Sequence, residues 1–83
     1  MQWSVSWSDE AASDLSKIDN KDAKRIVEKL EEASKNPNHY FERLVGNDYY
    51  KLRIGDYRVL VVFFHTNNTI HIQKLGHRKN IYK

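Results

Sequence analysis

Residues 49–64 read YYKLRIGDYRVLVVFF and have the pattern of a β-hairpin. Successive side chains of a strand point to opposite faces, so Lys51 and Arg53 share one face and the apolar residues beside them share the other. Gly55 and Asp56 follow as a short turn, which makes the next strand antiparallel. Residues 57–64 form a nearly continuous apolar run, as expected of a central strand covered on much of both faces.

Two further strands are predicted on either side of this hairpin in the sequence. Thr66, Asn67 and Asn68 form a second turn, and residues 69–75 continue as a strand. At the start of the chain, apolar residues alternate with Gln and Ser over residues 2–8, which predicts a short strand with one buried face.

The region between the first strand and the hairpin predicts two helices. Ser8 or Asp9 is a suitable N-cap for the first, whose apolar positions continue at helical spacing to Ile18. The second helix follows the Asp19-Asn20 break, and Asn36-Pro37 ends it because the residue before a proline avoids the helical region. Its buried face is predicted to hold Ala23, Ile26, Val27, Leu30 and Ala33. Residues 38–48 are predicted to be a connecting loop.

The predicted order is therefore β-α-α-β-β-β, within a single domain spanning residues 1–83. It indicates an α+β fold, in which an N-terminal αα-hairpin packs on one face of a small, mainly antiparallel, twisted sheet. The opposite face of the sheet stays free. Basic residues are expected to gather on that face or beside it.

The charge of the chain is divided unevenly along its length. The overall net charge is +3, but residues 1–42 carry six Lys/Arg and nine Asp/Glu, whereas residues 43–83 carry eight Lys/Arg and two Asp. This asymmetry indicates a polyanion or an acidic partner that contacts mainly the second half. The alternative interpretation is that the excess charge only maintains solubility.

Several classes of protein are excluded by composition. The chain has no cysteine, so disulfides and cysteine-based metal sites are ruled out. No apolar run approaches 18 residues and the N-terminus lacks the pattern of a signal peptide, so we expect a cytoplasmic protein with no membrane contact. His65 and His71 flank a turn without a nearby carboxylate, so we interpret them as ordinary strand residues and predict no metal site.

Cations and tyrosines are interleaved along the predicted strands and at their ends. The cations are Lys51, Arg53, Arg58, Lys74, His77 and Arg78, and the tyrosines among them are Tyr49, Tyr57 and Tyr82. This combination suits single-stranded nucleic acid, because cations hold phosphates and aromatic rings stack on unpaired bases. The alternative is a solvated sheet face on which long basic side chains cover apolar surface.

Two short motifs favour the first interpretation. They are the RIGDYR hairpin at residues 53–58 and the GHR sequence at residues 76–78, which is followed by Tyr82. With the order of elements and the length, these motifs resemble the RelE/ParE toxin superfamily of toxin–antitoxin systems, over essentially the whole chain. RelE-type members are endoribonucleases that cut mRNA in the ribosomal A site, whereas ParE-type members inhibit DNA gyrase without cutting nucleic acid.

The resemblance implies a set of site residues. The implied catalytic residues are Lys51, Arg58, Arg78 and Tyr82, with His77 as a further candidate, and the implied nucleic-acid-binding residues are Arg53, Arg43, Lys74, Tyr49 and Lys79. Val45 and Tyr49 depart from the pattern, since many ribonuclease members carry basic residues at the corresponding positions. No metal or organic cofactor is implied.

Cleavage by attack of the 2′-OH on the adjacent phosphate requires a base, a group that stabilises the charged phosphorane, and an acid for the leaving 5′-oxygen. Arg58 suits the phosphorane because its planar guanidinium donates two hydrogen bonds and stays charged. Lys51 is the candidate base, and Arg78 or His77 the candidate group at the leaving oxygen. Tyr82 is a candidate for stacking on a base or orienting it.

Three functions remain open on the sequence. The first is a ribosome-dependent mRNA interferase, and the others are a ParE-like gyrase inhibitor and a catalytically weakened member that mainly binds its antitoxin. All three imply a cognate antitoxin, expected to be acidic or amphipathic and to cover the basic face and the segment around Tyr82. The first also implies the ribosome and mRNA as partners.

Overall fold

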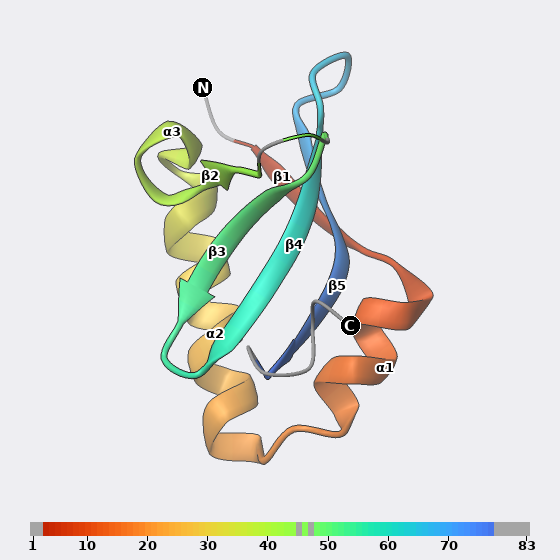
Figure 1. The fold of residues 1–83 in the computed structure, drawn as a ribbon, viewed down its shortest axis with the longest axis vertical. Coiled ribbons are helices and arrows are strands. Elements are labelled where there is room, and N and C mark those ends of the chain that lie inside the picture. Colours follow the sequence, from red (N-terminus) through yellow and green to blue (C-terminus); the bar gives the residue numbers. More distant parts are fainter. Residues whose placement is uncertain (1–2, 45, 47, 78–83) are drawn as a thin grey trace.

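The protein folds as a five-stranded sheet with helices on one side, as the computed structural model shows for residues 3–44, 46 and 48–77 (Figure 1). The elements are β1 (Ser4–Trp7), α1 (Asp9–Ser16), α2 (Asn20–Ser34), α3 (Pro37–Tyr40), β2 (Glu42–Arg43), β3 (Tyr50–Ile54), β4 (Tyr57–Phe64) and β5 (Thr69–His77). The strand order is β1-β5-β4-β3-β2; β1 pairs with β5 in parallel and all other pairs are antiparallel. The predicted α+β class and the predicted longer elements are confirmed.

The segment between α2 and β3 is more structured than the sequence predicts. Residues 38–48 were expected to form a loop, but α3 occupies its start and β2 follows, with Glu42 opposite Lys51 and Arg43 opposite Tyr50. One helical turn and two strand residues are too short to show a periodicity. Strand β5 also runs to His77, two residues further than predicted.

The core lies between α2 and one face of the sheet, which we call the helix face. Ile26, Leu30 and Ala33 of α2 are buried in one cluster with the alternate residues of the three long strands. Those strand residues are Leu52, Ile54, Val59, Val61, Ile70, Ile72 and Leu75. Figure 1 shows α2 behind the sheet and α1 beside the β5 edge. The Oγ of Ser8 accepts a hydrogen bond from the backbone N–H of Ala11 and donates one to the carbonyl of Gln73, which anchors the start of α1 to β5.

The other face of the sheet, the open face, carries the alternate residues of β3 and β4. Lys51, Arg58, Leu60 and Val62 are half-buried and Arg53 is exposed. No described helix packs on this face, yet three of its β4 residues are half-buried and Phe64 is exposed, so the predicted covering of β4 is confirmed for the helix face and only in part for the open face. Within the described ranges, no helix is long and apolar enough to cross a membrane.

Candidate functional site

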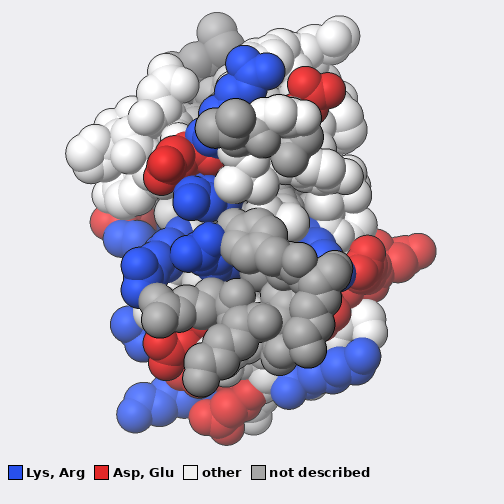
Figure 2. All heavy atoms as spheres, in the orientation of Figure 1, with Lys and Arg blue, Asp and Glu red and all other residues white. Residues whose placement is uncertain are grey.

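Cations gather on the open face in two rows that cross the sheet. In one row Arg53, Arg58 and Gly76 lie opposite one another on β3, β4 and β5. In the adjacent row Lys51, Leu60 and Lys74 are aligned in the same way. Lys and Arg side chains accordingly gather over the middle of this face (Figure 2). The predicted grouping of Lys51, Arg53 and Arg58 is thus present in the structure.

These three cations line a pocket at the β3 edge, which we call the basic pocket. It has a volume of about 330 Å³ and is lined by Lys29, His39, Tyr40, Glu42, Lys51, Leu52, Arg53 and Arg58. Strand β2 pairs only with Tyr50 and Lys51, so the remaining edge of β3 is left beside α2 and α3. The volume lies at the lower end of the range for small-molecule sites, which is sufficient for one nucleotide-sized group.

The wall of the basic pocket formed by α2 and α3 is held by local contacts. The Nζ of Lys29 lies 3.1 Å from a carboxylate oxygen of Glu32 and 4.9 Å from the ring centre of Tyr40. The hydrogen bond from Lys29, together with its charge, lowers the pKa of Glu32 below its ordinary value. The ring of His39 packs edge to face with Tyr40 at 4.9 Å. The contact between Lys29 and Tyr40 therefore joins α2 to α3 at this wall.

Three cations lie close together on the sheet side of the basic pocket. Arg53 and Arg58 lie directly opposite each other on neighbouring strands, and like charges in that arrangement destabilise a sheet. Among the described residues, neither Lys51 nor Arg53 has a carboxylate within the 4.0 Å limit of an ion pair. Arg58 is half-buried and its Nε atom is buried, so its stem is fixed in the face. An arrangement of this kind is suited to binding an anion.

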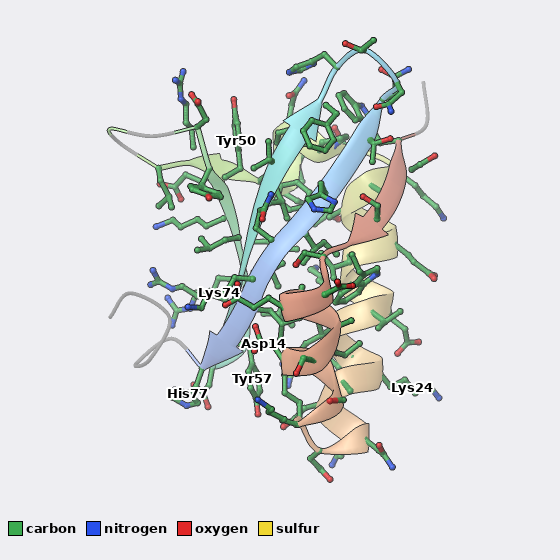
Figure 3. All side chains as sticks on the ribbon, turned by 90° about the vertical axis from the view of Figure 1, so that its right-hand side faces the viewer. Asp14, Lys24, Tyr50, Tyr57, Lys74 and His77 are labelled. Carbon is green, nitrogen blue, oxygen red and sulfur yellow. The ribbon has the colours of Figure 1, made fainter. Side chains whose placement is uncertain are left out.

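We expect the substitution Arg53→Gln to raise the free energy of unfolding by about 0.2–1 kcal/mol, because it removes the repulsion with Arg58. The gain should shrink at high salt, which screens the two charges. Denaturant titration at low and high ionic strength measures both effects. Lys24→Gln is the matched control, since Lys24 is exposed and points away from the sheet (Figure 3). Equal stability of Arg53→Gln and the unmodified protein at low salt would show that the two arginines do not repel.

His77 does not line the basic pocket. It pairs with Tyr57, whereas the next pair along the same strands is Arg58 with Gly76, so His77 and Arg58 point to opposite faces. The rings of His77 and Tyr57 are 5.9 Å apart in an edge-to-face arrangement. Figure 3 shows Tyr57, Lys74 and His77 at the same end of the sheet, with Asp14 of α1 beside them.

His77 belongs instead to a second pocket, between α1 and the end of β5. This pocket has a volume of about 400 Å³ and is lined by Asp14, Lys17, Ile18, Tyr57, Lys74, Leu75, Gly76 and His77. Burial, reinforced by the charge of Asp22, raises the pKa of Tyr57, whose hydroxyl donates a hydrogen bond to that carboxylate at 3.4 Å.

Helix α1 supplies carboxylates to the β5 edge beside the second pocket. An oxygen of Asp14 accepts from the backbone N–H of Leu75 at 3.3 Å, and the Nζ of Lys74 is 3.7 Å from a carboxylate oxygen of Glu10. Among the described residues, Lys74 beside the second pocket is therefore nearer to a carboxylate than Lys51 and Arg53 in the basic pocket are.

The remaining predicted residues are dispersed. Arg43, exposed on β2, lines a third pocket of about 320 Å³ with Asp48, Tyr50, Val62, Phe63 and His65. Tyr49 is exposed just before β3. The structural positions of Arg78, Lys79, Tyr82 and Val45 lie outside the described residues.

His65 and His71 do not face each other. His71 hydrogen-bonds with the Oγ of Ser6 at 2.8 Å and stacks on Phe64, whereas His65 packs against Trp3. Phe63 and Phe64 are consecutive in β4 and point to opposite faces. His65 lies beside Phe63 and His71 beside Phe64, so the two histidines are on different faces. The described ranges contain no group of three side chains arranged to hold a metal ion.

Five residues of the basic pocket are missing from the sequence-based site: Lys29, His39, Tyr40, Glu42 and Leu52. Pro37 at the start of α3 is a signal for a helical turn, because proline is favoured at the first helical position. No local pattern places that turn against β3. Glu42 is the one carboxylate among the described residues that line the basic pocket.

Comparison with known proteins covers almost the whole chain. Residues 5–82 match the family model described as the ParE toxin of the type II toxin–antitoxin system parDE. The chain is also 39% identical over 77 residues to a protein of Methanocaldococcus jannaschii assigned as toxin RelE4, covering 90% of this chain and 82% of that protein.

Solved structures share the fold. The RelBE2 toxin–antitoxin complex of Mycobacterium tuberculosis contains a similar chain, with a TM-score of 0.84 at 23% identity, covering 94% of this chain and 100% of that one. The RelB–RelE antitoxin–toxin complex of Methanococcus jannaschii contains another, with a TM-score of 0.75 at 26% identity, covering 94% of this chain and 95% of that one.

Proposed function

The chain belongs to the ParE toxin family of type II toxin–antitoxin systems, within the RelE/ParE superfamily, and from this premise we propose that it is a ribosome-dependent endoribonuclease. It cleaves mRNA in the ribosomal A site by attack of the 2′-OH on the adjacent phosphate, and thereby inhibits translation. The observation that carries the proposal is the basic pocket, where Lys51, Arg53 and Arg58 line one cavity without an ion-pairing carboxylate on Lys51 or Arg53 among the described residues.

Arg58 is the proposed stabiliser of the phosphorane. Its guanidinium belongs to a half-buried side chain on a central strand, with Arg53 opposite it. Burial strengthens its interaction with a developing negative charge, and the rigid strand fixes where its planar donors point. Arg53 then holds a phosphate next to the scissile one.

The leaving 5′-oxygen has two candidate partners. Arg78 remains a proposal from the sequence motif, and so does the stacking role of Tyr82. His77 lines the second pocket, so a role for His77 requires the substrate to continue past Gly76 around the end of β5. Lys74 lines that pocket as well and is proposed to bind the RNA there.

Lys51 is proposed as the base, and Glu42 lies opposite it on β2 as a second group able to accept a proton. We expect Lys51→Met to lower the cleavage rate at least about 10²-fold, because it removes the group proposed to take the proton of the attacking 2′-OH. Cleavage rates of Lys51→Met and Glu42→Gln, measured in the same translation reaction, check this. If Lys51→Met cleaves at the normal rate and Glu42→Gln does not, the role passes to Glu42.

Primer extension in a reconstituted translation reaction tests the cleavage. We expect cuts within codons that appear only when ribosomes translate the message. The second candidate function is ParE-like inhibition of DNA gyrase, which is favoured by the family model that the chain matches. Loss of gyrase supercoiling without RNA cuts would support that function and contradict the ribonuclease. Both targets imply action in the cytoplasm.

A cognate antitoxin is the proposed protein partner. Similar chains have been solved as RelBE2 and RelB–RelE toxin–antitoxin complexes. The open face offers a partner the basic rows, and next to them Leu60, Val62 and Phe64, of which Phe64 is 44% exposed. An acidic, amphipathic chain complements both. Toxicity on expression alone, and its loss when the antitoxin is co-expressed, is the expected result.

A further inference from the structure

Gly76 stands within β5, where glycine is unfavourable because it has no side chain to pack and loses more backbone freedom on folding than other residues. A glycine in a strand usually marks a left-handed backbone, a bulge or the close approach of another group. The first reason does not apply. Among the described residues, the glycines with positive φ are Gly46 and Gly55.

The second reason does not apply either. The bulge in β5 lies between the partners of Leu60 and Val61, where Gln73 is the extra residue. Around Gly76 the register is continuous, with Leu75, Gly76 and His77 opposite successive residues of β4. A regular strand of this kind accepts most side chains.

Close approach by the described part of the protein is absent as well. A Cβ atom built on Gly76 would meet no described atom within 4 Å. Within residues 3–44, 46 and 48–77, no atom fills the space that a side chain would occupy. It lies on the same face as Arg58, because Gly76 is directly opposite Arg58 in the register.

The neighbours of that space are cationic. Arg58 and then Arg53 follow Gly76 across the sheet, and adjacent strands are only about 4.8 Å apart. The row therefore consists of two arginines beside a backbone position that has no side chain. Guanidinium groups bind phosphate through paired hydrogen bonds, and they need lateral room for its oxygens.

We propose that Gly76 is a clearance position, at which the sugar–phosphate backbone of single-stranded RNA passes over β5 to reach Arg58 and Arg53. This inference rests on the proposed function, and it gives Gly76 the role of leaving room for the substrate to reach the site. A side chain at position 76 would stand where the phosphate approaches, and would cover the guanidinium of Arg58 from the β5 side.

The test compares Gly76→Ala and Gly76→Leu with Thr69→Leu, which adds bulk on the same face at the other end of β5. Binding is measured by fluorescence anisotropy with a 2′-O-methyl RNA oligonucleotide, which lacks the attacking hydroxyl and so is not cleaved. We expect Gly76→Leu to weaken binding about 10-fold or more, Gly76→Ala to weaken it less, and Thr69→Leu to leave it unchanged. In Gly76→Leu, the slope of the logarithm of the binding constant against the logarithm of the salt concentration should fall by the amount expected for about one phosphate contact.

Thermal unfolding completes the test. Because no described atom fills the space, Gly76→Ala should unfold at the same temperature as the unmodified protein or higher. A lower midpoint would show that part of the protein itself occupies the space, and would overturn the proposal. Unchanged RNA binding by Gly76→Leu would overturn it too, as would loss of antitoxin binding with RNA binding retained.

The primer-extension assay separates this inference from the proposed function. Ribosome-dependent cuts at full rate in Gly76→Leu would refute the clearance role and leave the ribonuclease intact. RNA binding that weakens in Gly76→Leu, in a protein that makes no cuts, would support the clearance role and contradict the ribonuclease.

Discussion

The substitution Arg58→Ala is expected to lower the rate of ribosome-dependent mRNA cleavage at least about 10²-fold, the usual cost of removing one donor to a charged transition state. Arg58 lies on a central strand of the sheet, lines the basic pocket and is opposite Arg53. No other described side chain of the basic pocket is a half-buried guanidinium, so none replaces its paired donors. Initial rates from primer extension, at saturating ribosome concentration, measure the effect.

Two variants separate chemistry from charge. Arg58→Lys keeps the charge but loses the planar pair of donors, so its rate should fall between those of Arg58→Ala and the unmodified protein. Lys24→Ala removes one positive charge from the outer side of α2 and should cleave at the normal rate. Near-normal cleavage by a folded Arg58→Ala would remove Arg58 from the site.

The largest effect on stability is expected at Ile72. This residue is fully buried in the middle of β5, where it pairs with Trp7 of β1 and Val61 of β4. Ile72→Ala should lower the free energy of unfolding by about 2–5 kcal/mol, because it leaves a cavity that the sheet cannot close. Small domains are stable by only about 5–15 kcal/mol, so the change removes a large share of the total.

Val62→Ala is the matched control for Ile72→Ala. Val62 is also a β-branched strand residue, but it is half-buried on the open face, so its loss should cost about 1 kcal/mol or less. Urea titration of both variants and of the unmodified protein measures the two losses in the free energy of unfolding. The slope of that free energy against urea concentration should be the same in all three. Equal losses in the two variants would mean that the open face is packed as tightly as the helix face.

The hairpin shows what local pattern can predict. Alternation over residues 49–64 places Lys51 and Arg53 on one face and Leu52 and Ile54 on the other, and the structure has this arrangement. It is predictable because the two-residue period of a strand is a property of the backbone alone. The Gly55 turn then brings Arg58 opposite Arg53, so the centre of the candidate site follows from a few adjacent residues.

The assignment of His77 shows where local pattern stops. In the sequence His77 is next to Gly76 and two residues from the end of a predicted strand, so it was grouped with Arg58. The structure continues β5 to His77, and the same alternation then turns its ring to the side of Tyr57. One more strand pair at the end of an element decides which pocket a side chain lines.

By itself, the sequence determined the α+β class, the helix and open faces of the central strands, and the basic character of the second half, because each depends on residues close together in the chain. Only the tertiary structure decided that α3 closes one side of the basic pocket and that Glu42 lies opposite Lys51. It also placed Gly76, whose missing side chain leaves a space that no described atom fills, directly opposite Arg58. These features join segments that are distant in sequence, and packing of α2 on the sheet sets their relative positions.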